Sequence, residues 1–397
     1  MKILLVHNRY QQLGGEDTIL ATEADLLKSY GHEVHLYQED NHKIADMNPL
    51  ALTKATLWNG QSYRNLQKLI RQMQPEIVHF HNTFPLISPS AYYAVRDLGI
   101  PVVQTIHNFR LFCANALFFR DGRVCEDCLQ QKNPLPGIIN ACYRDSFTAT
   151  TAATAMVEFH KLLGTWHKAI DVFIAYSNFA HAKLIEGGLS PEKISFKTNF
   201  LYPTPEVGSG AGKYALFVGR ISPEKGTETL LNTWRKLDGR LPLKVVGDGP
   251  IAPQLAAMAK EIPGVEWLGR KPLAEVYQLM GNAAFLVIPS EWYETFGRVA
   301  IEALAKGTPL LVSNIGALAE LVEPYHNGLT FEPGNESDLR EQVTWLLDNP
   351  DKLQQMRHGA RQSFEANYRA TDNYQRLMEI YQQAINQKNQ QLAVSLT

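Results

Sequence analysis

The chain has 397 residues, of which 45% are hydrophobic and 20% are charged, and its formal net charge is −2. This length exceeds one ordinary hydrophobic core and indicates two domains, and the near-zero charge provides no field that would attract nucleic acid. Because no apolar stretch approaches the roughly 20 residues that span a bilayer, we expect a cytosolic protein, with peripheral association at the inner face of a membrane left open.

Short apolar strands alternate with amphipathic helices along the whole chain. The strand KILLVH comes first and reads as a buried strand, not as a signal peptide. The predicted strands after it are HEVHLY, EIVHFH, PVVQTIH, DVFIAYS, YALFVGR, LKVVGDG, VEWLG, AAFLVIPS and PLLVSN. Strands that are apolar on both faces and separated by helices are typical of parallel sheets. The sequence therefore predicts an α/β protein with two doubly wound, Rossmann-like domains, whose ligands bind at the carboxyl ends of the strands.

A linker separates the two predicted domains. The segment 202–213, YPTPEVGSGAGK, is rich in glycine and proline and poor in hydrophobic residues. We expect the first domain over residues 1–203 and the second over residues 204–372. A last helical pattern within residues 373–397 follows all the strands of the second domain, and we expect it to pack back on the first domain before a frayed tail.

Polar residues lie where several strands of the first domain end. His107 ends the strand VVQTIH, and the doublet Gly14-Gly15 follows the first strand and opens a helix. Because ligands bind at this edge of a doubly wound sheet, His107 is a candidate for the active site. Further candidates at strand ends, each with a structural role in the core as its alternative, are His79, His81, Ser177 and Asn199.

All four cysteines lie in a long insertion after His107, at residues 108–145. They are Cys113, Cys125, Cys128 and Cys142, in the pattern C-x11-C-x2-C-x13-C. The C-x2-C pair has the spacing of structural zinc sites, and the other two cysteines could complete a tetrahedral set. An iron–sulfur cluster is an alternative, as are reduced thiols or a disulfide. The insertion directly follows His107, so we hypothesise that it shapes an acceptor pocket.

The second domain opens with a loop that carries two cations. In YALFVGRISPEKGTETLL a strand ends at Gly219, Arg220 follows, and Lys225 comes five residues later, just before a helix. Two cations on one loop at the carboxyl end of a strand suit the two phosphates of a nucleotide. The alternative is an ordinary exposed loop.

A pair of glutamates surrounds the start of a later helix. In SEWYETFGRVAIEALAKGTPLLVS, Glu294 lies in a loop and Glu302 lies in the second turn of a helix that begins near Phe296-Gly297. The free N–H groups at a helix start bind diphosphate, and a glycine lets a ligand approach the backbone. The alternative is that these acids only cap the helix dipole.

The motifs GRISPEKG, VVGDGP, VEWLGR and E-x7-E, in this order, resemble the nucleotide-sugar-binding half of the family-4 glycosyltransferases, and the resemblance covers essentially the whole chain. It implies the GT-B fold, in which two Rossmann-like domains face a central cleft. It also implies a retaining, hexose-transferring enzyme that uses a UDP- or GDP-linked sugar and a glycan or lipid-linked acceptor, in polysaccharide or glycolipid synthesis.

The resemblance also implies roles for individual residues. Arg220 and Lys225 would hold the diphosphate, Glu294 would contact the transferred sugar, and Glu302 would bind the ribose. His107 resembles the family's histidine beside the transferred sugar. The remaining donor-binding residues implied are Gly14, Gly15, Gly219, Leu268, Gly269, Arg270, Phe296 and Gly297. For Gly247, Asp248 and Gly249 we expect a structural role.

The sequence offers no evident acid nucleophile and no DxD motif placed for the diphosphate. We therefore expect same-face substitution, with the two cations in place of Mg²⁺ and no cofactor for catalysis. Two alternatives to a transferase stay open: a nucleotide-sugar epimerase or hydrolase, and a non-catalytic nucleotide-sugar-binding regulator.

Overall fold

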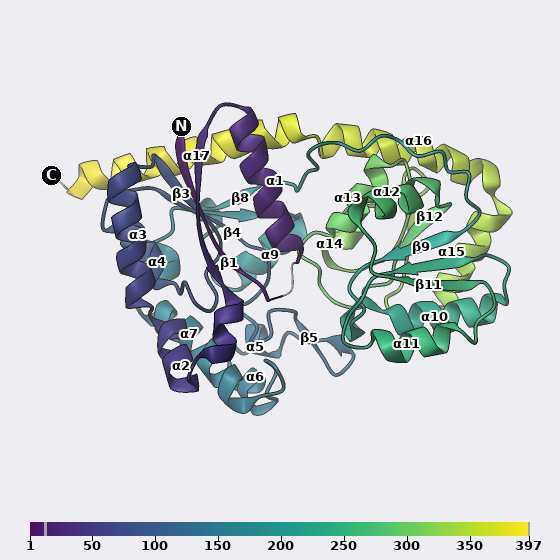
Figure 1. Ribbon diagram of the computed structural model, residues 1–397, viewed down its shortest axis with the longest axis horizontal. Helices are drawn as coiled ribbons and strands as arrows, with labels where there is room; N and C mark the ends of the chain where they lie inside the picture. The colour runs from purple at the N-terminus through teal and green to yellow at the C-terminus, as the bar shows by residue number, and fades with distance from the viewer. Residues whose placement is uncertain (12–13, 396–397) are drawn as a thin grey trace. The chain divides into compact units, whose positions relative to one another are not determined.

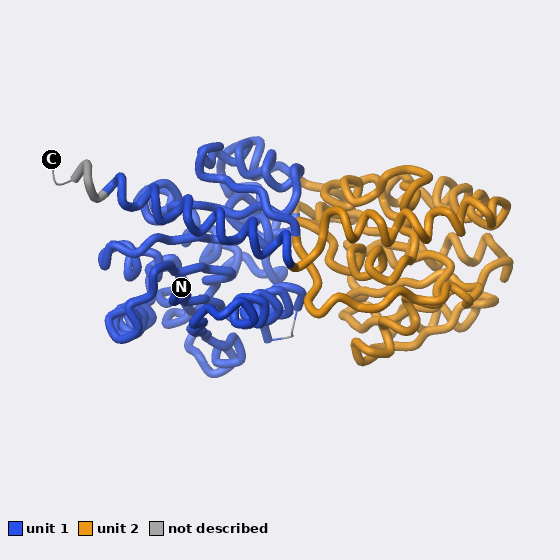
Figure 2. The backbone as a smooth tube through the Cα atoms, turned by 90° about the horizontal axis from the view of Figure 1, so that it is seen from above, with its two compact units in different colours: residues 1–117, 126–198, 371–397 blue, residues 118–125, 199–370 orange. Residues whose placement is uncertain are grey.

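The computed structural model describes residues 1–11 and 14–395, which form two compact units (Figure 2). The first unit comprises 1–117, 126–198 and 371–395, and the second comprises 118–125 and 199–370. All of residues 108–145 are predicted to belong to the first domain, whereas residues 118–125 group with the second unit. The ring of Phe118 packs edge-to-face on that of Tyr293, with 6.3 Å between centroids, which ties this short segment to the second unit.

The first unit is built on a six-stranded parallel sheet in the order β2-β1-β3-β4-β7-β8. Its strands are β1 (Lys2–Arg9), β2 (Glu33–Asp40), β3 (Ile77–Asn82), β4 (Val102–Thr105), β7 (Val172–Ala175) and β8 (Ile194–Phe196). Every residue of β3, β4 and β7 is buried, as helices on both faces of a parallel sheet require.

Helices connect these strands, and the last helix of the chain belongs to the same unit. The helices are α1 (Gly15–Ser29), α2 (Pro49–Leu57), α3 (Gly60–Met73), α4 (Ser90–Arg96), α5 (Asp127–Gln130), α6 (Leu135–Ile139), α7 (Phe147–Leu162), α8 (Thr165–Lys168), α9 (Asn178–Glu186) and α17 (Ala370–Ser395), with 3-10 turns η1 (Asn41–Asp46) and η2 (Pro191–Lys193). Leu377, Ile380, Tyr381 and Ala384 of α17 are buried in one hydrophobic cluster with residues of β1 and α1 (Figure 1).

The second unit has its own six-stranded parallel sheet, in the order β11-β10-β9-β12-β13-β14. The strands are β9 (Ala215–Val218), β10 (Leu243–Val246), β11 (Val265–Gly269), β12 (Phe285–Ile288), β13 (Leu310–Ser313) and β14 (Gly328–Phe331), and β5 (Phe119–Arg120) pairs with β6 (Arg123–Val124) as a separate hairpin. The order reverses between β9 and β12, which is the point where doubly wound sheets bind their ligands. The predicted fold class, with two parallel Rossmann-like sheets, is confirmed.

The helices of the second unit cover both faces of this sheet. They are α10 (Thr227–Leu237), α11 (Ala252–Ala259), α12 (Leu273–Asn282), α13 (Arg298–Ala305), α14 (Gly316–Ala319), α15 (Glu336–Asp348) and α16 (Pro350–Asn367), with the 3-10 turn η3 (Pro223–Lys225). Trp234 of α10 is fully buried in the core, and its indole N–H donates to Leu241 O at 2.8 Å. The core therefore leaves no indole donor unsatisfied at this position.

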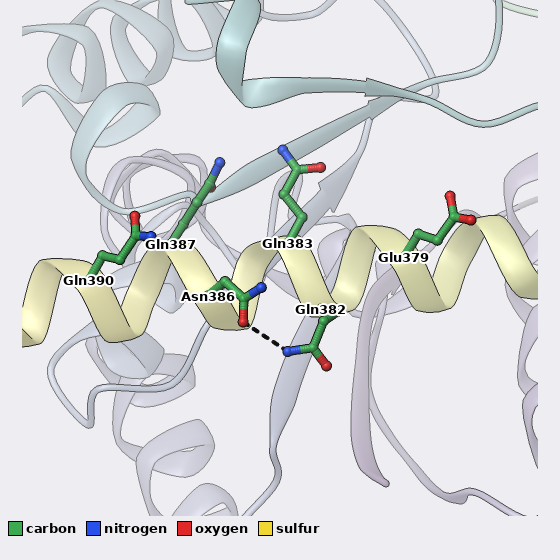
Figure 3. A pocket seen from close by; sticks show the side chains of 6 residues that line it. All are labelled: Glu379, Gln382, Gln383, Asn386, Gln387 and Gln390. Atoms are coloured by element: carbon green, nitrogen blue, oxygen red, sulfur yellow. Dashed lines mark hydrogen bonds between the residues drawn. The ribbon is translucent and has the colours of Figure 1, made fainter.

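The outer face of α17 is polar, whereas its buried face is apolar. Five carboxamides and one glutamate line a hollow along it (Figure 3): Glu379, Gln382, Gln383, Asn386, Gln387 and Gln390. Gln382 donates to Asn386 at 2.9 Å. Within residues 1–11 and 14–395, no helix combines the length and the apolarity needed to cross a membrane.

Candidate active site

The loops that follow β9 and β12 are joined at the switch point of the second sheet. The two strands pair in parallel, so both loops leave the same edge. Glu291 N donates to Glu224 O at 2.9 Å, and Thr229 Oγ1 donates to Glu291 Oε1 at 2.6 Å. The two loops that carry the predicted cations and glutamates are therefore held together.

Lys225 and Glu294 form an ion pair across these two loops. Lys225 Nζ lies 2.7 Å from Glu294 Oε1, and Ser290 Oγ donates to the same carboxylate oxygen, also at 2.7 Å. Lys225 ends the turn η3 after β9, and Glu294 lies in the loop between β12 and α13. Two groups that the sequence placed on separate motifs are thus in direct contact.

Two glycines make this contact possible. Gly226 has φ +64° and Gly297 has φ +97°, a region that favours residues without a side chain. A Cβ on Gly226 would collide with the carbonyl oxygen of Pro289, and a Cβ on Gly297 would lie 2.6 Å from the side chain of Leu318. Gly226 therefore lets η3 pack against the end of β12, and Gly297 lets α13 begin directly after the loop.

The charge on Glu294 is stabilised although the side chain is buried, with 7% of the residue exposed. Burial alone would raise the pKa of Glu294, but the Lys225 ammonium and the hydrogen bonds from Lys225 and Ser290 lower it below its ordinary value. The pair is thus a carboxylate and an ammonium at neutral pH. A ligand diphosphate would compete with Glu294 for the hydrogen bonds of Lys225.

Glu302 lies in a separate, less polar environment on α13. Burial raises the pKa of Glu302, and the nearby Arg298 guanidinium offsets this only in part. Arg298 Nε is 3.0 Å from Glu302 Oε1. Arg298 Nη1 is buried and has no hydrogen-bond partner in the described part of the chain. This pair therefore offers both an acceptor and an unused donor to a ligand.

The other predicted donor-site residues of the second unit lie on the same edge of the sheet. Arg220 is exposed and makes no hydrogen bond or ion pair with any residue the structure describes. Leu268 and Gly269 end the edge strand β11, and Arg270 follows them. The amide of Gly219 donates to Val246 O at 3.0 Å. The ring of Phe296 is buried.

The residues expected to be structural do hold the β9 loop. Ile221 N donates to Asp248 O at 3.0 Å, and a Cβ on Gly247 or Gly249 would collide with the backbone of the same loop. This packing agrees with the expected structural role of Gly247, Asp248 and Gly249.

In the first unit, the Gly14-Gly15 doublet opens α1 as expected, but one of its amides already donates a hydrogen bond to a side chain of the same unit. Gly14 N donates to Asp17 Oδ2 at 2.9 Å, and His7 Nε2 lies 3.0 Å from the other oxygen of Asp17. Residues 12 and 13 of this loop lie outside the described residues. The carboxylate of Asp17 thus lies at the start of α1, where negative charge is favoured.

His107 contacts a second histidine from the neighbouring strand. His107 Nε2 lies 3.0 Å from His81 Nδ1, and both residues line a cavity of about 70 Å³ at the end of β4. Burial lowers the pKa of His107, and the adjacent histidines lower it further. His107 is therefore a neutral imidazole beside a cavity, which can donate or accept one hydrogen bond.

A larger cavity, of about 260 Å³, lies between the insertion and α7, α8 and the end of α9. Its wall includes the apolar side chains of Phe112, Leu129 and Val157. Arg110, Leu111 and Trp166 line this cavity and also the cavity beside His107. The insertion thus forms part of a mainly apolar pocket next to the candidate catalytic histidine.

The four cysteines are divided between the two compact units. The four are half-buried, and the Sγ of Cys113 donates to Asn115 Oδ1 at 3.0 Å. In the described residues, the one group of three potential ligand atoms within 4.8 Å of each other is Glu23, His79 and His81. Cys125 also groups with the second unit and the other three cysteines with the first. The zinc site stays a prediction.

Of the strand-end candidates, Ser177 caps α9 by accepting from Ala180 N at 3.0 Å, and Asn199 is buried.

Other polar residues of these sites were not predicted from the sequence. Arg298 could have been found, because it lies one helical turn before Glu302. Glu23 and Lys197 are fully buried and lie 3.0 Å apart, but they are separated by 174 residues. No local pattern marks such a pair.

Both halves of the chain match models of glycosyltransferase families. Residues 206–363 match the model of the glycosyl transferases group 1. Residues 13–199 match the model of glycosyltransferase family 4. The two models together match most of the chain.

Individual relatives and solved structures are similar over long stretches. An uncharacterized glycosyltransferase of Methanocaldococcus jannaschii is 26% identical over 361 residues, which are 88% of this chain and 90% of that protein. A GDP-mannose-dependent alpha-mannosyltransferase of Corynebacterium glutamicum is 34% identical over 291 residues, 73% of this chain and 63% of that protein. The crystal structure of Anabaena HepE in complex with UDP has a TM-score of 0.68 at 16% identity, covering 96% of this chain and 99% of that one.

Proposed function

The chain belongs to the group 1 glycosyltransferases of GT-B type, and from this premise we propose that it moves a hexosyl group from a UDP- or GDP-linked sugar to a glycan or lipid-linked acceptor. Transfer retains the anomeric configuration and serves cell-surface polysaccharide or glycolipid synthesis. The protein works in the cytosol, at the inner face of the membrane when the acceptor is lipid-linked.

The observation that carries this proposal is the Lys225–Glu294 contact at the switch point of the second sheet. A partly exposed ammonium beside the start of α13 suits a diphosphate, and the carboxylate next to it suits the hydroxyls of the attached sugar. Arg220, exposed on the same loop, supplies the second cation. Glu302 and Arg298 bind the ribose, and the backbone at Leu268–Arg270 borders the base.

Named relatives support a nucleotide-sugar donor without choosing the nucleotide. HepE was crystallised with UDP and with UDP-glucose, and the Corynebacterium relative uses GDP-mannose by its name. On the acceptor side, the apolar cavity of the first unit shares a wall with the cavity beside His107. Its apolar lining favours an acceptor that carries a hydrocarbon group.

The chemical step we propose is substitution on one face of the sugar. The acceptor oxygen bonds to the anomeric carbon as the bond from that carbon to the phosphate oxygen breaks, and the acceptor's proton passes to the departing phosphate. Lys225 and Arg220 stabilise the charge that builds on this phosphate. Glu294 is held by Lys225 and Ser290, so its role is binding and it does not attack the sugar.

Thermal unfolding in the presence of UDP, GDP and their sugar conjugates tests the function. A ligand at about 100 times its Kd stabilises the folded protein by about 2.7 kcal/mol, so one nucleotide series should raise Tm clearly. Donor turnover is then measured with and without candidate acceptors. Turnover that needs an acceptor supports a transferase, equal turnover without one indicates a hydrolase or epimerase, and binding without turnover indicates a regulator.

Replacing Glu302 by alanine should weaken nucleotide binding. Hydrogen bonds to a charged group contribute about 1.5–3 kcal/mol, so we expect a roughly 10- to 100-fold rise in Kd for the nucleotide. Calorimetry with UDP or GDP measures it. Glu336→Ala, which removes a partly buried glutamate paired with Lys236 on the same unit, is the matched control. An unchanged Kd in Glu302→Ala would remove Glu302 from the site.

Chelation should leave the transfer rate unchanged on mixing, because the cations of the β9 loop serve the diphosphate. Rapid loss of transfer activity on adding EDTA, with recovery on adding Mg²⁺, would contradict this role of Lys225 and Arg220.

We further propose that the insertion holds a structural zinc when the four cysteines close around it. Elemental analysis of the purified protein tests this, and less than one zinc per chain would contradict it.

A further inference from the structure

A cluster of ionisable side chains is buried in the first unit, beneath His107. Glu23 of α1 and His79 and His81 of β3 are 0%, 0% and 2% exposed, and Lys197, just after β8, is 1% exposed. Glu23 Oε2 lies 3.0 Å from Lys197 Nζ, and Glu23 Oε1 lies 3.1 Å from His79 Nδ1 and 3.2 Å from His81 Nε2. One carboxylate therefore faces a lysine on one side and two imidazoles on the other.

The protonation states of this cluster follow from its contacts. Burial alone would raise the pKa of Glu23, but Lys197 and the two histidines hold it well below its ordinary value. Burial also lowers the pKa of His81 to about 4. At neutral pH the glutamate is therefore a carboxylate, which can only accept hydrogen bonds, and His81 is a neutral imidazole with one ring proton.

These states determine where the ring protons lie. His81 Nε2 faces the carboxylate at 3.2 Å, so this nitrogen carries the proton of His81. The other nitrogen, Nδ1, is then an acceptor, and it lies 3.0 Å from His107 Nε2. His107 Nε2 must therefore donate, and because His107 is neutral as well, its Nδ1 has no proton.

The same three side chains, Glu23, His79 and His81, have the spacing of metal ligands. We assign them no metal, because the ammonium of Lys197 already neutralises the one carboxylate, and a divalent cation would be buried beside it without a further counter-charge. Asn373 Oδ1 of α17 accepts a second hydrogen bond from Lys197, at 3.0 Å. Glu23 Oε2 is thus paired with Lys197, while Glu23 Oε1 contacts the two imidazoles at 3.1 and 3.2 Å without a hydrogen bond of normal geometry.

We propose that Glu23 and His81 are positioning residues that hold His107 in the tautomer protonated on Nε2. The unprotonated Nδ1 of His107 is then an acceptor, which suits a hydroxyl of the transferred sugar. This last step rests on the proposed function, whereas the tautomer does not.

The imidazole ¹⁵N spectrum of the wild-type protein at neutral pH tests the tautomer directly. Protonated and unprotonated ring nitrogens give separate signals, and a His107→Asn sample identifies those of His107. We expect a protonated Nε2 and an unprotonated Nδ1 for both His81 and His107. A proton on Nδ1 of His107 would overturn the inference, and this result requires no variant in the cluster to fold.

The Glu23→Gln variant tests whether Glu23 determines the tautomer of His107. Lys197 needs an acceptor, so the amide oxygen of Gln should face Lys197 and the amide NH₂ should face His81 Nε2. That nitrogen must then accept, His81 Nδ1 becomes the donor, and His107 is left protonated on Nδ1. The ¹⁵N signals should exchange, and kcat/KM for transfer should fall about tenfold, as expected for the loss of one hydrogen bond.

Tyr381→Phe is the matched control. Tyr381 OH lies 2.9 Å from His79 Nδ1, so this variant disturbs the same buried cluster outside the path from Glu23 to His107. We expect the His107 signals to stay as in the wild type. If Glu23→Gln folds and leaves the His107 tautomer unchanged, the positioning role is wrong. If the tautomer changes but no sugar is ever transferred, only the proposed function is wrong.

Discussion

Replacing Lys225 by alanine should reduce kcat for sugar transfer by about 10²- to 10³-fold, the effect of removing one group that stabilises charge in a transition state. Lys225 contacts Glu294 at 2.7 Å in the joined loops of the second sheet. Its loss removes a cation from the departing phosphate and leaves Glu294 buried without its counter-ion. The pKa of Glu294 should therefore rise above its ordinary value, because burial is then opposed only by hydrogen bonds.

Steady-state kinetics with saturating donor measure this effect, and circular dichroism checks the fold. The matched control is Lys236→Ala, because Lys236 is also paired with a glutamate on the second unit but is half-exposed. We expect the control to retain wild-type kcat. A Lys225→Ala enzyme with near-normal kcat and an intact fold would refute the proposed donor site.

Replacing Lys197 by methionine should cause a large decrease in the free energy of unfolding. Removing one partner of a buried ion pair costs about 3–5 kcal/mol, because the other charge is left buried and unpaired. Glu23 and Lys197 are both almost fully buried. Urea unfolding measures the loss. In the double variant Glu23→Gln/Lys197→Met no charge stays buried, so much of the stability should return.

In the Lys197→Met variant, the contribution of Glu23 to the pH dependence of the free energy of unfolding should also change its sign. In the wild type the pKa of Glu23 is lowered by folding, so its stabilising contribution is present above the unfolded pKa of about 4.3 and is lost only as pH falls through the lower folded value. Without Lys197 the folded pKa is raised instead. The stability of Lys197→Met should then decrease as pH rises from about 5 to about 7.5. A free energy of unfolding equal to that of the wild type at both pH values would contradict this account.

The fold and the contact between the two loops of the candidate donor site could be predicted largely from local patterns. Strands such as FLVIPS are apolar on both faces, and the loops after them carry the charged groups of the candidate site. Lys225 and Glu294 are 69 residues apart, yet each lies in the loop that follows a strand, and the carboxyl ends of parallel strands share one edge. Their contact therefore follows from topology and needs no long-range information.

The buried cluster and the cysteines show what local patterns miss. Glu23 occupies an ordinary helical position and Lys197 follows a short strand, so nothing in either segment indicates a partner 174 residues away. For the cysteines the C-x2-C spacing predicts a metal site, but the spacing says nothing about how the chain is divided. Residues 118–125 pack with the second unit, whereas the residues on either side belong to the first.

The position of α17 has a consequence for how this protein is made. Leu377, Ile380, Tyr381 and Ala384 complete a cluster that includes Ile3 and Leu5, so β1 can complete its packing only after α17 has been synthesised. The second unit, residues 199–370, can condense while its C-terminal neighbour is still inside the ribosome. We therefore expect the second unit to fold before the first, so that a ribosome-stalled chain whose α17 is still inside the exit tunnel resists protease in its second unit alone.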